Sequence, residues 1–249
     1  MNETEAARGE WPAVNDGYSA EGIGKPKPAT EQAVGAIMHL LTSGELGPGD
    51  RLPAERDLAL RLGVSRSTIR EAIRGLEMMR VLQVRHGEGI FVTSLDAPLL
   101  LEASGFALQL MRDHEVVDLL ELRAILEGAA ASLASARMTD EQRHTLLRRL
   151  EQLDAAATAD ELLGADIAFH AAMAAGTGNV VLASLLDTFA ARTYRARHLN
   201  AGLGLEEALV RSRASHRRIY EAVVARDPEA ARASAHVANL AGWLRNVLT

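Results

Sequence analysis

The sequence predicts a mainly α-helical protein in two parts: short N-terminal helices that end in a small β-hairpin, and a C-terminal all-α helical bundle. Two observations predict this class. Five of the seven prolines lie in the first 53 residues, and none occurs between Leu99 and Asp227. The proline-free tract is rich in Ala, Leu, Arg and Glu, which lose little on entering a helix and leave its hydrogen bonds uninterrupted. We therefore expect the composition change near Pro98 to mark a domain boundary.

The composition also excludes several classes of protein. With 249 residues, 48% of them hydrophobic, the chain is long enough to bury a substantial core. It has no cysteine, which excludes disulfides, thiolate catalysis and Cys-ligated metals. No stretch of 18 apolar residues occurs, and the N-terminus is polar and acidic. We expect a cytoplasmic protein with no membrane partner.

Three segments follow from this organisation. Residues 1–24 are polar with isolated aromatics and predict a flexible tail. Residues 25–95 form the first predicted domain, and residues 98–249 form the second. The second is expected to be entirely helical.

The first domain is predicted to contain three helices and a hairpin. Apolar residues recur at helical spacing, and turn residues separate the helices. Gly63 ends the second helix, and Ser65 is placed to cap the third. Two β-rich runs flank a glycine-containing turn at 86–89, which is a hairpin signal. The predicted helices span residues 30–41, 54–62 and 65–79, and the predicted strands span 81–85 and 90–94.

The second domain is predicted to contain up to seven helices. Thr139 and Gln142 form a capping-box pattern, and Pro228 stands at a helix start, where its missing N–H is harmless. The predicted spans are 99–112, 115–136, 140–157, 159–176, 180–199, 205–226 and 228–248.

Charge is unevenly distributed along the chain. The net charge of −6 argues against a generally basic nucleic-acid binder. Between Arg51 and His86, however, eight arginines stand against four acidic residues, so this segment is +4 and the remainder −10. Because the planar guanidinium suits bidentate contacts to phosphate or guanine, this segment is a candidate nucleic-acid surface.

The third predicted helix carries arginines on one face. Arg66, Arg70 and Arg74 stand at i, i+4 and i+8, and an apolar stripe runs along another face. The arginines extend roughly 12 Å at 1.5 Å per residue, which fits a major groove. A solvent-facing helix with many arginines would show the same stripe. A short helix, a tight turn, an arginine helix and a two-stranded wing together, however, predict a winged helix-turn-helix.

The segment from Gly44 to Val92 (GELGPGDRLPAERDLALRLGVSRSTIREAIRGLEMMRVLQVRHGEGIFV) resembles the N-terminal domain of the GntR family of transcriptional regulators, in its FadR-type branch. The resemblance implies an operator-binding set of Arg56, Arg66, Ser67, Thr68, Arg70, His86 and Gly87. Arg74 is added from the stripe alone, and a phosphate contact or a pair with Glu77 or Glu71 explains it equally well. The wing-tip His86 and Gly87 would also suit an ordinary hairpin turn.

The second domain resembles the all-helical FCD effector domain of the same branch, through DLLELRAILEGAAA, DIAFH and SHRRIYEAVVARDPEAA. Asp166 and His170 share one helix face, and His216 would complete a set of oxygen and nitrogen ligands for zinc, nickel or manganese. An ordinary helix-surface pair is the alternative. Metal-binding members carry a further histidine where this chain has Ala238. His236 lies roughly 200° from that position around the helix and cannot replace it.

The metal site therefore departs from the family pattern. Three protein ligands, with water or an effector carboxylate completing the shell, and a degenerate site both remain open. Arg123 resembles the arginine that family members direct into the effector pocket, where it would pair with a carboxylate. An i, i+4 helix pair with Glu127 is the alternative. Asn179 is expected to cap a helix rather than contact a ligand.

The sequence thus predicts a ligand-responsive, DNA-binding transcriptional regulator, a repressor that binds a pseudo-palindromic operator as a homodimer at the nucleoid and responds to a small organic acid. One alternative is a metal-dependent enzyme using Asp166, His170 and His216. The chain has no nucleophile elbow, P-loop or dinucleotide-binding motif, and a catalytic function would leave the wing unexplained. Another alternative is an architectural DNA binder without an effector. We expect no catalytic residues.

Overall fold

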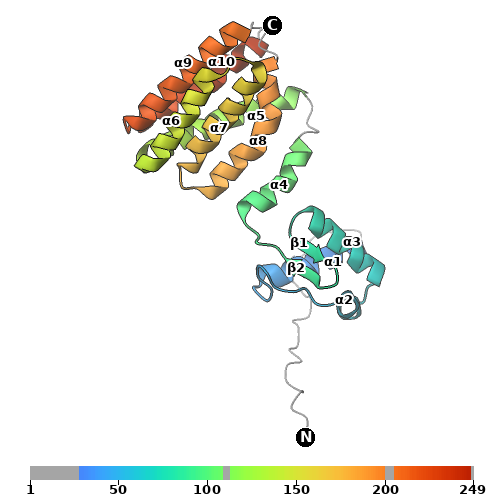
Figure 1. Cartoon of the computed structure of the whole chain (residues 1–249). Helices are drawn as coiled ribbons and strands as arrows, with labels where there is room; N and C mark the ends of the chain where they lie inside the picture. The colour runs from blue at the N-terminus through green and yellow to red at the C-terminus, as the bar shows by residue number, and fades with distance from the viewer. Residues whose placement is uncertain (1–27, 109–112, 200–204, 248–249) are drawn as a thin grey trace, which may run out of the picture. The chain divides into compact units, whose positions relative to one another are not determined.

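The computed structural model describes residues 28–108, 113–199 and 205–247 (Figure 1). Within them the chain is mainly helical, with ten helices and one two-stranded antiparallel sheet, as predicted. The chain divides into two compact units, and the boundary between them along the sequence lies between Leu95 and Asp96. The predicted tail at 1–24 lies outside the described residues. None of the described helices is long and apolar enough to cross a membrane.

The N-terminal unit contains three helices and the hairpin. Gly63 ends the second helix with a φ of 64°, a left-handed conformation that glycine adopts without steric cost. Ser65 then caps the third helix, because its side chain accepts a hydrogen bond from Thr68 N. The predicted helix–turn–helix thus forms as the sequence indicated. The elements are α1 (Ala29–Thr42), α2 (Glu55–Leu62), α3 (Arg66–Met78), β1 (Leu82–Arg85) and β2 (Gly89–Val92).

The hairpin has a second neighbour that the sequence did not predict. Strands β1 and β2 pair from Leu82 opposite Val92 to Arg85 opposite Gly89. On its other edge, β2 pairs with the segment before α2: Leu52 N donates to Ile90 O at 2.8 Å, and Val92 N donates to Asp50 O at 2.8 Å. Backbone hydrogen bonds therefore hold β2 on both edges.

One apolar core joins the three helices of this unit to the sheet. The buried positions of α3 recur at helical spacing and face α1, while Leu82 and Val92 contribute the inner face of the hairpin. The buried side chains are Ala33, Ile37, Leu40, Leu52, Leu58, Ala59, Ile69, Ala72, Ile73, Leu76, Val81, Leu82 and Val92.

The C-terminal unit is all-α, as predicted. Helix α5 is central to it, since it packs against α7, α8, α9 and α10, and α4 packs against α8 (Figure 1). Its helices are α4 (Ala97–Leu108), α5 (Asp113–Arg137), α6 (Asp140–Ala155), α7 (Ala159–Ala175), α8 (Val180–Leu199), α9 (Leu205–Val224) and α10 (Pro228–Val247). Residues 109–112, predicted as the end of the first of these helices, lie outside the described residues.

Local signals explain where these helices begin and end. The predicted capping box at Thr139 and Gln142 forms, and Thr158 with Glu161 forms another at the start of α7. Asn179 caps α8 by accepting a hydrogen bond from Leu182 N, as expected. Helix α9 ends earlier than predicted, because Arg226 takes a positive φ of 56° and breaks the helix.

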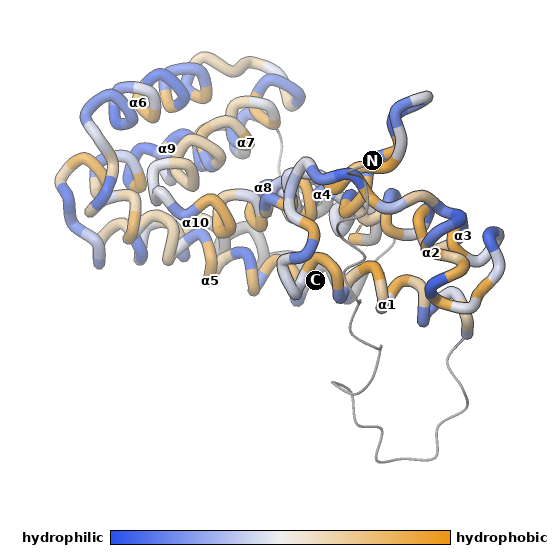
Figure 2. The backbone as a smooth tube through the Cα atoms, turned by 90° about the horizontal axis from the view of Figure 1, so that it is seen from below, coloured by the Kyte–Doolittle hydropathy of each residue, from blue (hydrophilic) through white to orange (hydrophobic). Residues whose placement is uncertain are grey.

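Small residues allow the central helices to approach closely. Ala130, Ala131 and Ala134 of α5 are fully buried in the main cluster, together with Phe169 and Met173 of α7. Hydrophobic residues are interspersed with hydrophilic ones along α6, as expected for a helix with one buried face (Figure 2). This packing brings side chains of α5, α7 and α9 to one interior site.

Candidate nucleic-acid interface and metal centre

The arginine face of α3 is exposed. Arg66, Arg70 and Arg74 are all solvent-accessible, whereas Ile69 and Ile73 on the other face are buried in the core. The predicted separation of a cationic stripe from an apolar stripe is therefore present. Such a helix presents hydrogen-bond donors to a polyanion while its apolar face fixes its position in the domain.

The middle arginine of this face has a partner in its own chain. Arg70 Nε donates to Glu55 Oε2 at 2.8 Å, so the first turn of α2 holds the centre of α3. The arginine side chain remains 58% exposed. An exposed pair of this kind leaves the guanidinium accessible to another anion.

A cleft lies between α3 and the hairpin. Arg70 lines it together with the wing-tip residues His86 and Gly87, so the structure brings these three predicted DNA contacts to one surface. Arg85 lies over the Phe91 ring, 4.4 Å from its centroid. Gly87 takes a φ of 76° at the hairpin turn, a conformation that favours glycine. The charged residues of the cleft are Arg51, Glu55, Arg70, Arg74, Glu77, Arg85 and Glu88.

The remaining predicted contacts lie on α2 and the first turn of α3. Arg56 and Arg66 are exposed, Ser67 is exposed and Thr68 is half-buried. The Ser67 and Thr68 hydroxyls lie 2.6 and 2.8 Å from Ser65 Oγ. None of these four contact residues lines the cleft. They stand at a helix N-terminus, where amides and the helix dipole favour phosphate.

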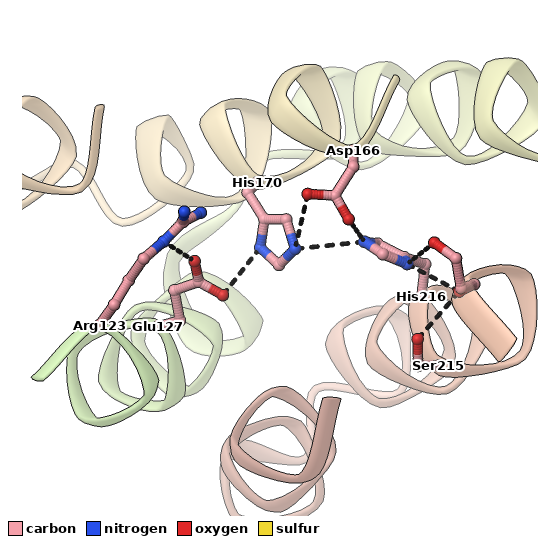
Figure 3. A network of polar contacts seen from close by, with 7 residues as sticks. Arg123, Glu127, Asp166, His170, Ser215 and His216 are labelled. Carbon is pink, nitrogen blue, oxygen red and sulfur yellow. Dashed lines mark hydrogen bonds and ion pairs between the residues drawn. The ribbon is translucent and has the colours of Figure 1, made fainter. Parts of the chain in front are cut away.

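The three predicted metal ligands converge in the C-terminal unit (Figure 3). Asp166 and His170 come from α7 and His216 from α9, and all three are buried. Ligand atoms of these residues lie within 4.8 Å of one another. His216 Nε2 is 3.0 Å from Asp166 Oδ1 and 3.2 Å from His170 Nε2.

Polar contacts on the outer side of each imidazole, a hydrogen bond for His216 and an ion-pair contact for His170, orient its inner nitrogen. His216 Nδ1 lies 2.7 Å from the Ser212 main-chain carbonyl oxygen, and His170 Nδ1 lies 3.1 Å from Glu127 Oε2. The Ser212 carbonyl oxygen only accepts hydrogen bonds, so His216 Nδ1 is the donor in that contact. The two Nε2 atoms and the Asp166 carboxylate face one another, and a divalent cation could take the place of the protons that pair them. The donor set fits a divalent metal.

The position of the missing family ligand is occupied by an apolar side chain. Ala238 on α10 is half-buried against the main core cluster, whereas His236 is exposed. His236 therefore does not replace a ligand at Ala238, as the helical geometry predicted. The described residues offer three ligands to a metal here.

Beside the metal centre lies a buried ion pair. Arg123 Nε donates to Glu127 Oε1 at 2.6 Å, and both side chains are at most 2% exposed. The predicted i, i+4 pair thus forms, and Arg123 also lines a cavity of about 20 Å³ next to His170. This volume holds about one water molecule. Asp187, Ile167, Leu186 and four alanines complete the lining together with Glu127.

Four groups in these sites were not predicted from the sequence: Glu55, Ser212, Asp187 and the second oxygen of Glu127. The spacing of Arg123 and Glu127 predicted their ion pair. No sequence signal predicted that Glu127 also faces His170, because that contact depends on how α5 packs against α7.

The fold and sites together define a class of protein: a winged helix-turn-helix unit followed by an all-α unit with a buried Asp/His/His cluster. Residues 29–92 match the bacterial regulatory proteins of the gntR family, and residues 118–239 match the FCD domain. The chain therefore belongs to the GntR family of transcriptional regulators and carries an FCD domain.

Relatives agree with this assignment. The HTH-type transcriptional regulator LutR of Bacillus subtilis is 32% identical over 208 residues, which cover 81% of this chain and 94% of that protein. The Uxu operon transcriptional regulator of Escherichia coli is 30% identical over 209 residues, covering 81% and 80%. A Streptococcus agalactiae GntR structure aligns with a TM-score of 0.58 and 31% identity, over 88% and 99% of the two chains. The family and these relatives are regulators, not enzymes, so the enzyme alternative is wrong.

Proposed function

We propose that this regulator is a repressor that binds a pseudo-palindromic operator as a homodimer and releases it, or binds it more tightly, in response to a small organic acid. The observation that carries the proposal is the exposed arginine face of α3 beside the wing. An α-helix with this face fits the major groove, and the wing lies next to it.

The predicted contacts to DNA come from α3, α2 and the wing. Arg66 and Arg70 can reach base edges or phosphates from α3, and Arg56 reaches backbone phosphates from α2. Ser67 and Thr68 offer short donors at the helix N-terminus, where phosphate is favoured. On the wing, His86 donates to phosphate or to the minor groove, and Gly87 allows close approach of the backbone.

Dimerisation is expected because one copy of the protein contacts only a short stretch of DNA. One recognition helix reads only a few base pairs, and two half-sites about one helical turn apart multiply the specificity. The operator should then be a pseudo-palindrome that mirrors the two-fold axis of the dimer. Binding should weaken steeply with salt, because arginines displace counterions from the phosphates.

The sensor site is the buried centre of the FCD domain. We assign the metal to Asp166, His170 and His216, with zinc, nickel or manganese as the ions that this ligand set suits. Since Ala238 supplies no fourth ligand, water or the carboxylate of the acid would complete the shell. Arg123 is the proposed anchor for that carboxylate.

Charge around the cavity favours an acid with a single carboxylate. One cation, Arg123, stands near three carboxylates, Glu127, Asp166 and Asp187. A divalent metal would bring the total close to zero, so the site accepts one negative charge more easily than two. The Asp187 carboxylate on the cavity wall would repel a second carboxylate and accept a hydrogen bond from a hydroxyl or ammonium group.

Control of DNA binding requires that the acid bind one arrangement of the dimer better than the other, because a ligand with equal affinity for both shifts nothing. An architectural DNA binder would lack this response. The effect of the acid on operator affinity therefore distinguishes the two functions.

An electrophoretic mobility-shift assay on an operator selected from random duplexes by the wild type tests the DNA-binding proposal. Arg66→Ala should weaken the shift by about 10- to 100-fold without changing the far-ultraviolet circular dichroism. Arg148→Ala, an exposed arginine of α6, is the matched control. Equal affinity of the wild type and the Arg66 variant would overturn the assignment of α3 as recognition helix.

A further inference from the structure

Glu127 touches both parts of the sensor site. Its Oε1 accepts from Arg123 Nε at 2.6 Å, and its Oε2 lies 3.1 Å from His170 Nδ1 (Figure 3). The carboxylate is 1% exposed. One buried side chain of α5 therefore joins the proposed acid anchor to a proposed metal ligand on α7.

We propose that Glu127 is a positioning residue that orients His170 for metal binding and couples this site to Arg123, so that the metal and the acid bind cooperatively. The inference rests on the proposed function, because it takes the metal and acid sites from there. It adds Glu127, which is neither a proposed metal ligand nor the proposed acid anchor. It also predicts that binding of the metal and binding of the acid strengthen each other.

Arg123 Nε donates to one oxygen of Glu127, and the other oxygen faces His170 Nδ1 at 3.1 Å, so both oxygens face groups that can donate. A glutamine at this position has one accepting oxygen and one donating nitrogen. Its amide nitrogen would face either Arg123 Nε–H or His170 Nδ1–H, leaving a buried donor unpaired. An aspartate is one methylene shorter and spans the two partners less well. The geometry thus requires glutamate itself.

The same contact fixes the protonation pattern of the ligand. An Nδ1–H placed toward Glu127 would leave Nε2 of His170 free to accept from His216 Nε2 or to bind a metal. A carboxylate behind an imidazole also raises the basicity of the metal-binding nitrogen. Loss of such an outer partner typically weakens metal binding about 10- to 100-fold.

Coupling to the acid follows from the charge that Arg123 shares. The terminal nitrogens of its guanidinium point away from Glu127 (Figure 3). A carboxylate bound at that end would compete with Glu127 for Arg123. The attraction between Glu127 and Arg123 would weaken, and that between Glu127 and His170 would strengthen. A stronger contact between Glu127 and His170 would hold the ligand in place, so the acid should tighten metal binding, and by reciprocity the metal should tighten acid binding by the same factor.

Calorimetric titration of the metal-free full-length protein with Zn²⁺ tests the positioning role. Glu127→Gln should weaken Zn²⁺ binding by about 10- to 100-fold, whereas Glu121→Gln, an exposed change on the same helix, should not alter it. Equal affinity of the wild type and E127Q would overturn the inference and leave the metal site intact. Failure of the wild type to bind Zn²⁺ would overturn the proposed metal site itself.

Two measurements on the wild type do not depend on the folding of a variant. Nitrogen-15 NMR of the metal-free protein should show His170 as the Nδ1–H tautomer, with its signal assigned by its loss in His170→Gln. The Nε2–H tautomer would contradict the positioning role. Acetate, used as the probe carboxylate, should tighten Zn²⁺ binding in the wild type, and an unchanged Zn²⁺ affinity would overturn the coupling.

Discussion

Arg70 Nε lies 2.8 Å from Glu55 Oε2, so an acidic residue of α2 holds the arginine at the centre of the recognition helix. The two side chains are 58% and 28% exposed. An exposed pair stabilises a protein by at most about 1 kcal/mol. The main effect of Glu55 is therefore to hold the Arg70 side chain in one orientation.

Glu55→Gln is expected to reduce discrimination between operator and non-operator DNA. Without the carboxylate, Arg70 loses its fixed orientation, while repulsion of phosphates near α2 also falls. The ratio of the two affinities, measured by fluorescence anisotropy at one salt concentration, should decrease. Glu45→Gln, an exposed change in the turn after α1, serves as the control. A ratio that stays the same would mean that the pair has no part in specificity.

Metal is expected to stabilise the C-terminal unit through His170. A ligand that binds only the folded state stabilises it by about 2.7 kcal/mol when present at 100 times its Kd. Thermal unfolding with and without a chelator should therefore differ in the wild type and agree in His170→Ala. His144→Ala, an exposed histidine of α6, should behave like the wild type. Equal and negligible metal content in all three proteins would argue against the site.

Gly176→Ala is expected to destabilise the protein by steric overlap alone. Its φ of −64° suits alanine, but an added Cβ would lie 2.5 Å from Cγ of the buried Met138. Overpacking of this kind costs about 1–3 kcal/mol. Urea unfolding should show the loss, and the double variant with Met138→Ala should lose less than the sum of the single variants. Strict additivity would exclude a direct clash.

Arg80→Gly and Arg226→Gly are each expected to stabilise the fold. Both arginines follow helices with positive φ values, 60° and 56°, where a Cβ is strained and glycine is not. The gain should be about 0.5–1 kcal/mol, because glycine also loses more entropy on folding. Thermal unfolding measures it. Alanine at either position keeps the Cβ, so a gain with alanine would point to the side chain rather than the backbone.

Glu161 is expected to contribute a pH-dependent stability. The hydrogen bonds from the Ala157 and Thr158 amides hold the pKa of its carboxyl below the ordinary value. The stabilisation is thus complete above the ordinary glutamate pKa and is lost as the pH falls through the lowered value. Urea unfolding across the acid range should show a shallower pH dependence for Glu161→Gln than for the exposed control Glu151→Gln. Parallel curves would contradict this role.

Most of the fold could be predicted because its signals are local. The α2 stop at Gly63, the caps at Ser65 and Thr139, and the hairpin turn each depend on a few neighbouring residues. The pairing of β2 with the segment at Asp50 could not, since it joins residues about forty positions apart through backbone atoms alone.

The sensor site was predictable in part for the same reason. Spacing placed Asp166 and His170 on one face of α7, but the approach of His216 from α9 depends on helix packing. The family resemblance supplied that third ligand. Neither spacing nor resemblance predicted that Glu127 contacts two partners at once, because one oxygen contacts Arg123 on the same helix and the other contacts His170 on α7.

The two-sided pairing of β2 has a mechanical consequence for regulation. Because the wing is anchored both to β1 and to the chain that leads into α2, it resists bending independently of the recognition helix. Amide protons of Leu52 and Val92 should exchange slowly, in contrast to those at the hairpin tip. Under the proposed function, a signal from the acid would have to reorient the whole N-terminal unit as a rigid body, and the spacing between the two copies of α3 in the proposed dimer would be the quantity under control.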